Sequence, residues 1–182
     1  MKPKPSVEIE LKLRIPAPGP FRPLLEALGF RETTAPQQEV SVLWDRDGEL
    51  RAVGSALRTR RFAGTSRLTW KGPKRPDPLL KIRPEHETGI SDGDALDAIL
   101  RALGYEPVLR MEKVRAVWDR ADLEACLDET PFGCYLELEG DPQAIRATME
   151  DLGLALNQAE PRSYPELYEA HSLGPAGRAP QS

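Results

Sequence analysis

Charged side chains recur two residues apart in several segments of this 182-residue chain. Near the N-terminus, the stretch VEIELKLR alternates apolar residues with Glu8, Glu10, Lys12 and Arg14. Neighbouring carboxylates suit hard divalent cations, which prefer oxygen ligands. Arginine suits phosphate, because its planar guanidinium can donate two parallel hydrogen bonds. Acids and bases in this pattern indicate a site that holds a metal ion together with a phosphate.

The charged pairs fall in segments that are typical of β-strands, where side chains at i and i+2 share a face. The other charged positions of this kind are Arg58, Arg60, Lys71, Arg83, Glu85, Glu87, Lys113, Arg115, Glu137 and Glu139. Like charges about 7 Å apart on a strand repel unless an opposite charge lies between them. A solvated face is a sound interpretation of any single strand, but the whole set favours charges that line an enclosed interior.

The remaining pattern supplies the elements that would position these residues. We predict strands at residues 6–15, 38–45, 56–62, 67–72, 79–89, 108–118, 123–129 and 134–140. Helices are predicted at residues 21–28, 91–104, 141–152 and 163–170, with a helical turn at 47–53. In the helix 91–104, Ser91 is the expected N-cap and Leu96, Ile99, Leu100 and Leu103 form an apolar stripe. The prediction is an α+β fold, a closed eight-stranded antiparallel barrel with a charged lumen and helices packed outside.

Composition excludes several classes of protein. The chain is 40% hydrophobic and 30% charged, and its net charge of −4 argues against a general nucleic-acid binder. No signal peptide and no stretch of about 18 apolar residues is present, so we expect a cytoplasmic protein without a membrane segment. The single predicted domain covers residues 1–172, and the tail 173–182 is expected to be disordered. Two cysteines and two distant histidines support neither a zinc site nor a Ser-His-Asp triad.

Charge is also divided unevenly along the chain. Residues 55–83 hold nine basic residues and one acid, whereas residues 121–160 hold ten acids and one base. Opposite blocks on one domain suggest a site that holds both an anion and cations. The chain has no G-x-x-x-x-G-K-[ST] loop, so side chains would have to bind the phosphate.

The motif Glu8-x-Glu10-x-Lys12 resembles the E-x-E-x-K signature of the CYTH domain family, the triphosphate tunnel metalloenzymes. Its companions follow in the family's order and extend the resemblance over residues 6–170: ALRTRR (56–61), LTWKGP (68–73), KIRPEHE (81–87), RMEKVRAVW (110–118), LDETPFGCYLELEG (127–140) and SYPEL (163–167). The resemblance implies a tunnel of eight strands and divalent-metal-dependent attack on triphosphates. Members of the family include inorganic, thiamine and nucleoside or RNA 5′-triphosphatases, and class IV adenylyl cyclases.

The resemblance also implies roles for individual residues. Glu8, Glu10, Glu137 and Glu139 would hold Mg²⁺ or Mn²⁺. The triphosphate would be bound by Lys12, Arg58, Arg60, Lys71, Arg83, Lys113 and Arg115. Glu85 is the candidate general base, and Asp128 is a further acid near the metals. The family often has Tyr-Phe-Asp where this chain has Leu43-Trp44-Asp45, and Arg162 is the nearest candidate for a basic residue that covers the site in some members.

Three functions remain open at this point. The leading hypothesis is a metal-dependent triphosphatase that acts on inorganic tripolyphosphate or another compact triphosphate, such as thiamine triphosphate. The alternative is a class IV adenylyl cyclase that converts ATP to cyclic AMP and pyrophosphate; it also needs a pocket for adenine and ribose, and no segment clearly supplies one. A non-catalytic sensor of polyphosphate or nucleotide is disfavoured, because all four expected glutamates are present. The expected partner is a small triphosphate rather than a nucleic acid, and a homodimer is left open.

Overall fold

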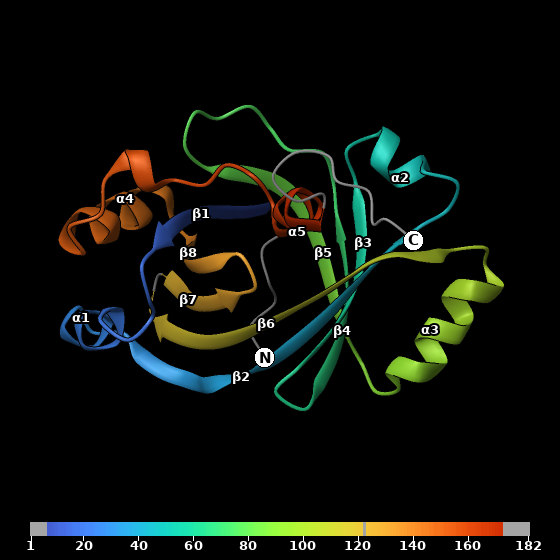
Figure 1. Ribbon diagram of the computed structural model, residues 1–182, viewed down its shortest axis with the longest axis horizontal. Helices are drawn as coiled ribbons and strands as arrows, with labels where there is room; N and C mark the ends of the chain where they lie inside the picture. The colour runs from blue at the N-terminus through green and yellow to red at the C-terminus, as the bar shows by residue number, and fades with distance from the viewer. Residues whose placement is uncertain (1–6, 122, 173–182) are drawn as a thin grey trace, which may run out of the picture.

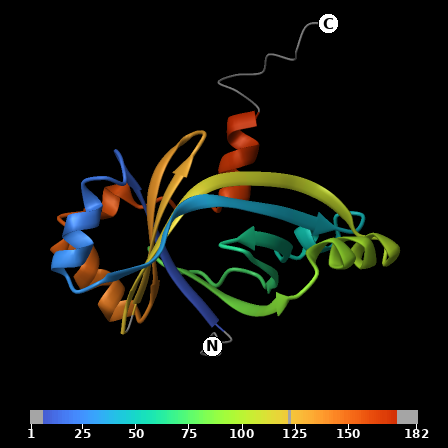
Figure 2. The same ribbon diagram turned by 90° about the horizontal axis from the view of Figure 1, so that it is seen from below.

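The computed structural model describes residues 7–121 and 123–172. In these ranges eight antiparallel strands form a closed barrel (Figure 1, Figure 2). The strands are β1 (Val7–Ile15), β2 (Arg31–Asp45), β3 (Ala56–Phe62), β4 (Thr65–Lys71), β5 (Lys81–Ile90), β6 (Glu106–Arg120), β7 (Leu123–Thr130) and β8 (Gly133–Gly140). Around the barrel they follow the order β1-β5-β4-β3-β2-β6-β7-β8, and β8 pairs with β1. The predicted barrel is confirmed.

Helices lie outside the barrel wall (Figure 1). They are α1 (Phe21–Ala27), α2 (Glu49–Ala52), α3 (Gly93–Ala102), α4 (Pro142–Asp151) and α5 (Tyr164–Ser172), with a 3-10 turn at Leu156–Gln158. Among the described residues, we find no helix that combines the length and the apolar character needed to cross a membrane. The predicted tail 173–182 lies outside the described residues.

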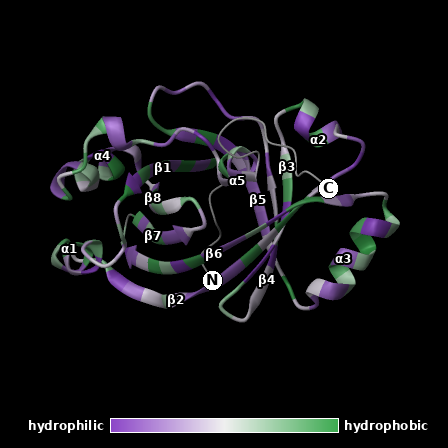
Figure 3. Cartoon of the chain, in the orientation of Figure 1, coloured by the Kyte–Doolittle hydropathy of each residue, from purple (hydrophilic) through white to green (hydrophobic). Residues whose placement is uncertain are grey.

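The hydrophobic core lies between the barrel wall and two of the helices. Leu11 and Leu13 of β1 are 1% and 0% exposed, and they pack in one cluster with Leu25 of α1 and Ile145 of α4. Figure 1 shows α1 and α4 on the same side of the barrel, and Figure 3 shows hydrophobic and hydrophilic residues alternating along its strands. Because neighbouring side chains of a strand point to opposite faces, the charged residues between these leucines face the lumen, as predicted.

The second and sixth strands are longer than the sequence pattern indicates. β2 begins at Arg31 rather than near residue 38, and β6 runs from Glu106 to Arg120. Their pairing shifts register between Glu32 and Thr34 and again between Thr34 and Gln37. Pro36 lies in the second shift, where its lack of an N–H removes one hydrogen bond of the ladder. The irregular pairing explains why the polar start of β2 has no strand-like alternation.

The helix α3 differs in two details from its prediction. Its N-cap is Asp92 rather than Ser91, because the Asp92 side chain accepts hydrogen bonds from the backbone N–H groups of Asp94 and Ala95. Of the predicted apolar stripe, Leu100 is buried, whereas Ile99 and Leu103 are 55% and 59% exposed. The helix therefore touches the barrel along a narrower face than the stripe suggests.

The last helix, α5, stands against β6 (Figure 2). The Glu112 backbone N–H of β6 donates to the Tyr168 hydroxyl at 3.0 Å. On the β7–β8 turn, the Phe132 ring packs edge-on against Tyr168, with the ring centroids 4.9 Å apart. Two ion pairs hold the helix from other elements, Arg51–Glu169 at 3.1 Å and Lys74–Glu166 at 3.0 Å. These contacts fix the N-terminal turn of α5 beside the barrel interior.

The location of the hydrophobic core outside the barrel predicts which leucines contribute most to the free energy of unfolding. Leu138 of β8 is fully buried, so Leu138→Ala should lower the free energy of unfolding by about 2–5 kcal/mol. Chemical denaturation followed by circular dichroism measures the change. Leu24→Ala on α1 is the matched control, because Leu24 is 43% exposed, and it should cost less than about 1 kcal/mol. Equal losses in the two variants would contradict this location of the core.

Candidate active site

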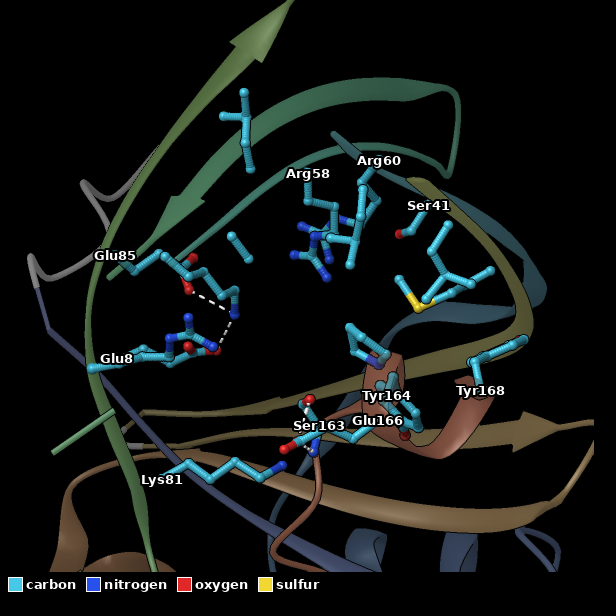
Figure 4. Close-up of a pocket in the computed structure, with 18 of the residues that line it drawn as sticks. Glu8, Ser41, Arg58, Arg60, Lys81, Glu85, Ser163, Tyr164, Glu166 and Tyr168 are labelled. Carbon is cyan, nitrogen blue, oxygen red and sulfur yellow. Dashed lines mark hydrogen bonds and ion pairs between the residues drawn. The ribbon is translucent and has the colours of Figure 1, made fainter. Parts of the chain in front are cut away.

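The barrel encloses a cavity of about 540 Å³ whose wall carries balanced charge (Figure 4). Among the described residues, ten basic and ten acidic side chains line it, so the cavity has no large net charge of its own. The basic residues are Lys12, Arg51, Arg58, Arg60, Lys71, Lys74, Lys81, Arg83, Lys113 and Arg115. The acidic residues are Glu8, Glu10, Glu39, Asp45, Glu85, Glu124, Glu137, Glu139, Glu166 and Glu169. A bound polyanion would therefore have to bring cations with it.

Lysines bridge the acids on the wall formed by β1, β4 and β5. The Lys71 ammonium lies 2.5 Å from a carboxylate oxygen of Glu8 and 2.8 Å from one of Glu85. Lys81 pairs with Glu10 at 2.9 Å, and the two residues are direct partners across β1 and β5. Lys81 was not among the predicted site residues, although it shares a strand face with Arg83 and Glu85.

A second group of ion pairs joins β1, β6 and β8. Glu137 lies 3.1 Å from Lys12 and 2.5 Å from Arg115. Burial lowers the pKa of Lys12 to about 8, despite the opposing attraction of Glu137. For Glu137, burial opposes the charged form, but Lys12, Lys113 and Arg115 hold its pKa well below the usual value. The carboxylate is therefore ionised and is surrounded by cations.

Asp128 lies behind the basic residues rather than on the cavity wall. Its side chain is completely buried and accepts hydrogen bonds from Lys113 at 2.9 Å and from Arg115 at 2.7 and 2.6 Å. The Tyr164 hydroxyl donates to the same carboxylate at 2.5 Å. A carboxylate with four donors is well placed to hold Lys113 and Arg115 in position. The structure thus brings Asp128 to the site, where it contacts residues of the cavity wall but does not line the cavity itself.

Glu39 is a second buried acid beneath the basic residues, and the sequence analysis missed it. It is 2% exposed and lies 3.6 Å from Arg60, 3.7 Å from Lys113 and 3.8 Å from Arg115. Burial alone would raise the pKa of Glu39, but Lys113 and Arg115 hold it far below the usual range. Its position six residues before Asp45, on the same face of the predicted strand, was the available signal.

The two arginines of β3 point into the cavity, but their surroundings differ (Figure 4). Arg60 pairs with Glu87 at 3.3 Å and with Glu39 at 3.6 Å. The Arg58 side chain makes no hydrogen bond or ion pair within the part of the chain that the structure describes, its Nε atom is buried, and its charge helps to lower the pKa of Glu39. Arg83, also predicted to bind substrate, lines the cavity and donates from Nε to the Gly72 carbonyl at 2.9 Å. Arg58 is therefore the guanidinium that is ready to receive an anion.

Three acids form a row across β7, β8 and β1. Glu139 is the direct partner of Glu124 on β7 and of Glu10 on β1, and all three line the cavity. Glu124, which was not among the predicted site residues, is thus a wall residue. We call these three residues the carboxylate row. Like charges directly opposite each other destabilise a sheet unless cations lie nearby.

The carboxylates fit a divalent cation by their chemistry. Carboxylate oxygens are the ligands that Mg²⁺ and Mn²⁺ prefer, and the charge balance of the cavity requires added cations when a triphosphate binds. Glu8, Glu10, Glu137 and Glu139 are the predicted ligands, and all four line the cavity. In the described ranges no three acidic, His or Cys side chains are arranged as a metal site, because lysines and arginines hold several of the acids.

The start of α5 covers one side of the cavity, and sequence reasoning missed this contribution. The Lys12 and Lys113 ammonium groups lie 3.6 and 4.0 Å from the centre of the Tyr164 ring. Ser163 accepts from the Leu167 N–H through its carbonyl, as expected at a helix N-terminus. The Arg162 guanidinium pairs with Glu160 and does not line the cavity, so it does not cover the site in this structure.

The tryptophan of β2 is buried in the wall of the cavity and also contacts the neighbouring helix α3. Trp44 is 2% exposed, donates to the Thr59 hydroxyl at 2.9 Å, and lies beneath Arg101 of α3. The resemblance to the family places Trp44 where other members often have an aromatic residue. These contacts make it part of the support for α3, and both Trp44 and its neighbour Leu43 line the cavity.

Comparisons with known proteins agree with this architecture. Residues 6–164 match the model of the CYTH domain. A curated protein of Methanocaldococcus jannaschii, named "Putative adenylate cyclase MJ0240", is 34% identical over 116 residues, which are 63% of this chain and 66% of that protein, just under two thirds of its length.

Solved structures share the same fold. A "putative adenylate cyclase" of Vibrio parahaemolyticus superposes with a TM-score of 0.78 at 22% identity, covering 91% of this chain and 99% of the other. The PH1819 protein of Pyrococcus horikoshii gives a TM-score of 0.75 at 26% identity, with 90% and 99% coverage. HpAC1 of Hippeastrum gives 0.68 at 22% identity, with 90% and 96% coverage. With its barrel, its charged lumen and the match over residues 6–164, this chain belongs to the CYTH domain family.

Proposed function

We propose that this protein hydrolyses a triphosphate and requires Mg²⁺ or Mn²⁺ to do so. The observation that carries the proposal is the cavity in which the Arg58 side chain makes no hydrogen bond or ion pair among the described residues, while carboxylates of β1 and β8 line the same cavity. A triphosphate needs several cationic donors, and a metal that accompanies it needs oxygen ligands. The same cavity wall offers both kinds of group.

Substrate binding would replace ion pairs between lysines and glutamates of the cavity by ion pairs between the lysines and phosphate. Lys12, Lys71 and Lys81 each hold a glutamate at 2.5–3.1 Å. Phosphate oxygens can replace those carboxylates as acceptors, because an ammonium bonds equally well to either anion. The glutamates would then be released to bind divalent cations. Charge in the cavity stays balanced when the metal and the triphosphate enter together.

The chemical step would be attack by water on the terminal phosphorus. A new P–O bond forms to water, the terminal anhydride P–O bond breaks, and the diphosphate product leaves with the electron pair. Glu85 is the proposed acceptor of the water proton; it is 4% exposed and lies beside Lys71. Lys113 and Arg115, held in place by Asp128, would stabilise the charge that builds on the phosphate oxygens. A divalent cation bound by the glutamates would supply Lewis acidity and charge neutralisation.

Adenylate cyclisation is the second candidate function. The name of the Methanocaldococcus relative favours it, whereas the Hippeastrum protein is described as a putative adenylyl cyclase with a dominant triphosphatase activity. Both reactions would use the same residues to bind the phosphates, but the nucleophile attacks a different phosphorus atom in each. Analysis of the products therefore distinguishes hydrolysis from cyclisation.

The first test is a product assay with ATP. Purified protein with Mg²⁺ or Mn²⁺ should release orthophosphate and ADP, and excess EDTA should abolish turnover, because the glutamates would lose their cations. Ion chromatography and nucleotide analysis measure all four products. Pyrophosphate formed in step with cyclic AMP would replace the hydrolase proposal with the cyclase. Turnover that persists in EDTA would remove the metal from the proposal.

The proposed metal ligands can be tested by isosteric substitution. Glu10→Gln and Glu137→Gln should each lower kcat by about 100-fold or more and raise the metal concentration needed for half-maximal rate. Glu129→Gln is the matched control, because Glu129 is an exposed residue of β7 that does not line the cavity. Thermal unfolding should confirm that each variant folds. Wild-type rates and metal dependence in both cavity variants would exclude these glutamates from the site.

The role of Arg58 can be separated from that of a neighbour on the same strand. Arg58→Gln should weaken triphosphate binding by about 10- to 100-fold, because one charge-assisted contact to phosphate is lost. Arg61→Gln provides the comparison, since Arg61 pairs with Asp94 of α3 instead of lining the cavity. Calorimetric titration with a non-hydrolysable triphosphate analogue gives both affinities. Similar affinities for the two variants would argue against Arg58 as a phosphate ligand.

A further inference from the structure

Glu39 of β2 contacts the basic residues of the cavity by charge alone. Its carboxylate oxygens lie 3.6 Å from a nitrogen of Arg60, 3.7 Å from that of Lys113 and 3.8 Å from one of Arg115. Charges attract at these distances, but no hydrogen bond forms. Among the described residues, its Oε2 atom has no hydrogen-bond partner, and the Ser41 hydroxyl donates to its Oε1 atom at 3.2 Å. Glu39 therefore balances charge without accepting hydrogen bonds from these three cations.

Two other buried acids of the network do accept such hydrogen bonds. Asp128 accepts them from two of the same cations at 2.6–2.9 Å, and Glu87 accepts one from Arg60 at 3.3 Å. Neither Asp128 nor Glu87 lines the cavity, whereas Glu39 does. The negative charge of Glu39 is thus the one of these three that a ligand in the cavity would meet.

Four cations share the charge of Glu39. Burial opposes the ionised form of this carboxyl, but Lys113, Arg115, Arg60 and Arg58 together lower its pKa far below the usual range. The Arg58 side chain makes no hydrogen bond or ion pair within the described ranges, so the longer-range attraction of Glu39 is part of what balances its charge. Glu39 provides negative charge that would otherwise have to come from a bound anion.

A phosphate that enters the cavity would have to compete with this carboxylate. It would approach the same guanidinium groups, and two negative charges close together repel each other. Orthophosphate brings no cation and reaches few donors, so nothing offsets the repulsion. A triphosphate that carries divalent cations can contact more of the ten basic side chains of the wall, and its cations reduce the repulsion. Glu39 should therefore weaken the binding of orthophosphate more than that of a metal-bound triphosphate.

We propose that Glu39 is a specificity-determining residue, an internal counter-anion that excludes orthophosphate from the cavity while a metal-bound triphosphate still binds. The inference rests on the proposed function for the identification of the cavity as a phosphate site. It also gives a reason for the release of the product, because orthophosphate formed by hydrolysis meets the same carboxylate. Glu39 acts on the affinity of ligands and takes no part in the bonds that form or break.

The test is a calorimetric titration with orthophosphate in the absence of divalent cations. Glu39→Gln keeps the length of the side chain and an acceptor for Ser41 but removes the charge, so orthophosphate should bind about tenfold or more tightly than to the wild type. The affinity for imidotriphosphate, a non-hydrolysable triphosphate, with Mg²⁺ should change by a smaller factor. Glu129→Gln removes the same charge from an exposed residue outside the cavity and should leave both affinities unchanged.

A purely structural role for Glu39 predicts the opposite sign. Basic residues that are held less firmly would bind phosphate more weakly, because more order must be imposed on binding. Equal or weaker orthophosphate binding by folded Glu39→Gln would therefore overturn the inference. If the variant folds only with orthophosphate present, thermal unfolding at increasing phosphate concentrations gives its affinity instead. Failure to fold at every phosphate concentration would also overturn the inference.

The outcomes separate this inference from the proposed function, because orthophosphate binding requires no turnover. Tighter orthophosphate binding by Glu39→Gln would support the counter-anion even if the protein hydrolyses nothing. Unchanged orthophosphate affinity in a variant of an active hydrolase would overturn the inference alone. Failure of both the wild type and Glu39→Gln to bind either phosphate would overturn the phosphate site and the inference together.

Discussion

The pairing of buried charges inside the barrel is the constraint on which the rest of the structure depends. Lys12 and Arg115 are 2% and 7% exposed, and both contact Glu137. A buried charge without a partner costs several kcal/mol, so buried cations such as Lys12 and Arg115 need an acid within reach. The strands must therefore close with a register that brings acids of one strand to bases of another. The same strand register therefore closes the barrel and pairs its buried charges.

This requirement explains why the hydrophobic core lies outside the barrel. Because ion pairs occupy the lumen face of β1 and β8, these strands turn their apolar faces toward α1 and α4. Asp128 and Glu39 form a deeper layer of the same network, since each is buried and faces Lys113 and Arg115. Both acids neutralise the basic side chains; Glu39 does so from the cavity wall, and Asp128 from behind it. The basic residues are thus ordered before any ligand arrives.

Much of this arrangement could be predicted from alternation alone. Strict spacing of two in β1, β3, β6 and β8 placed Glu10, Arg58, Lys113 and Glu137 on the lumen face, where the structure has them. Glu39 escaped notice because the positions two residues before and after it, Gln37 and Ser41, are not charged, and Asp45 lies six residues away. Tyr164 could not be found, because its place depends on how α5 docks against β6, a contact between segments about 50 residues apart. Periodicity describes one strand at a time and carries no information on such docking.

The order of residues along β6 bears on the choice between hydrolysis and cyclisation. Leu109 and Met111 line the cavity, and the next positions on the same face of β6 are Lys113 and Arg115. A nucleoside triphosphate with its base beside Leu109 would have its first phosphate beside Arg58 and its terminal phosphate nearer Arg115 and Glu137. Glu137 is one of the proposed metal ligands, so the activated end of the substrate would be the terminal phosphorus. This geometry favours attack at the end of the chain of phosphates over attack at the phosphorus that bears the ribose.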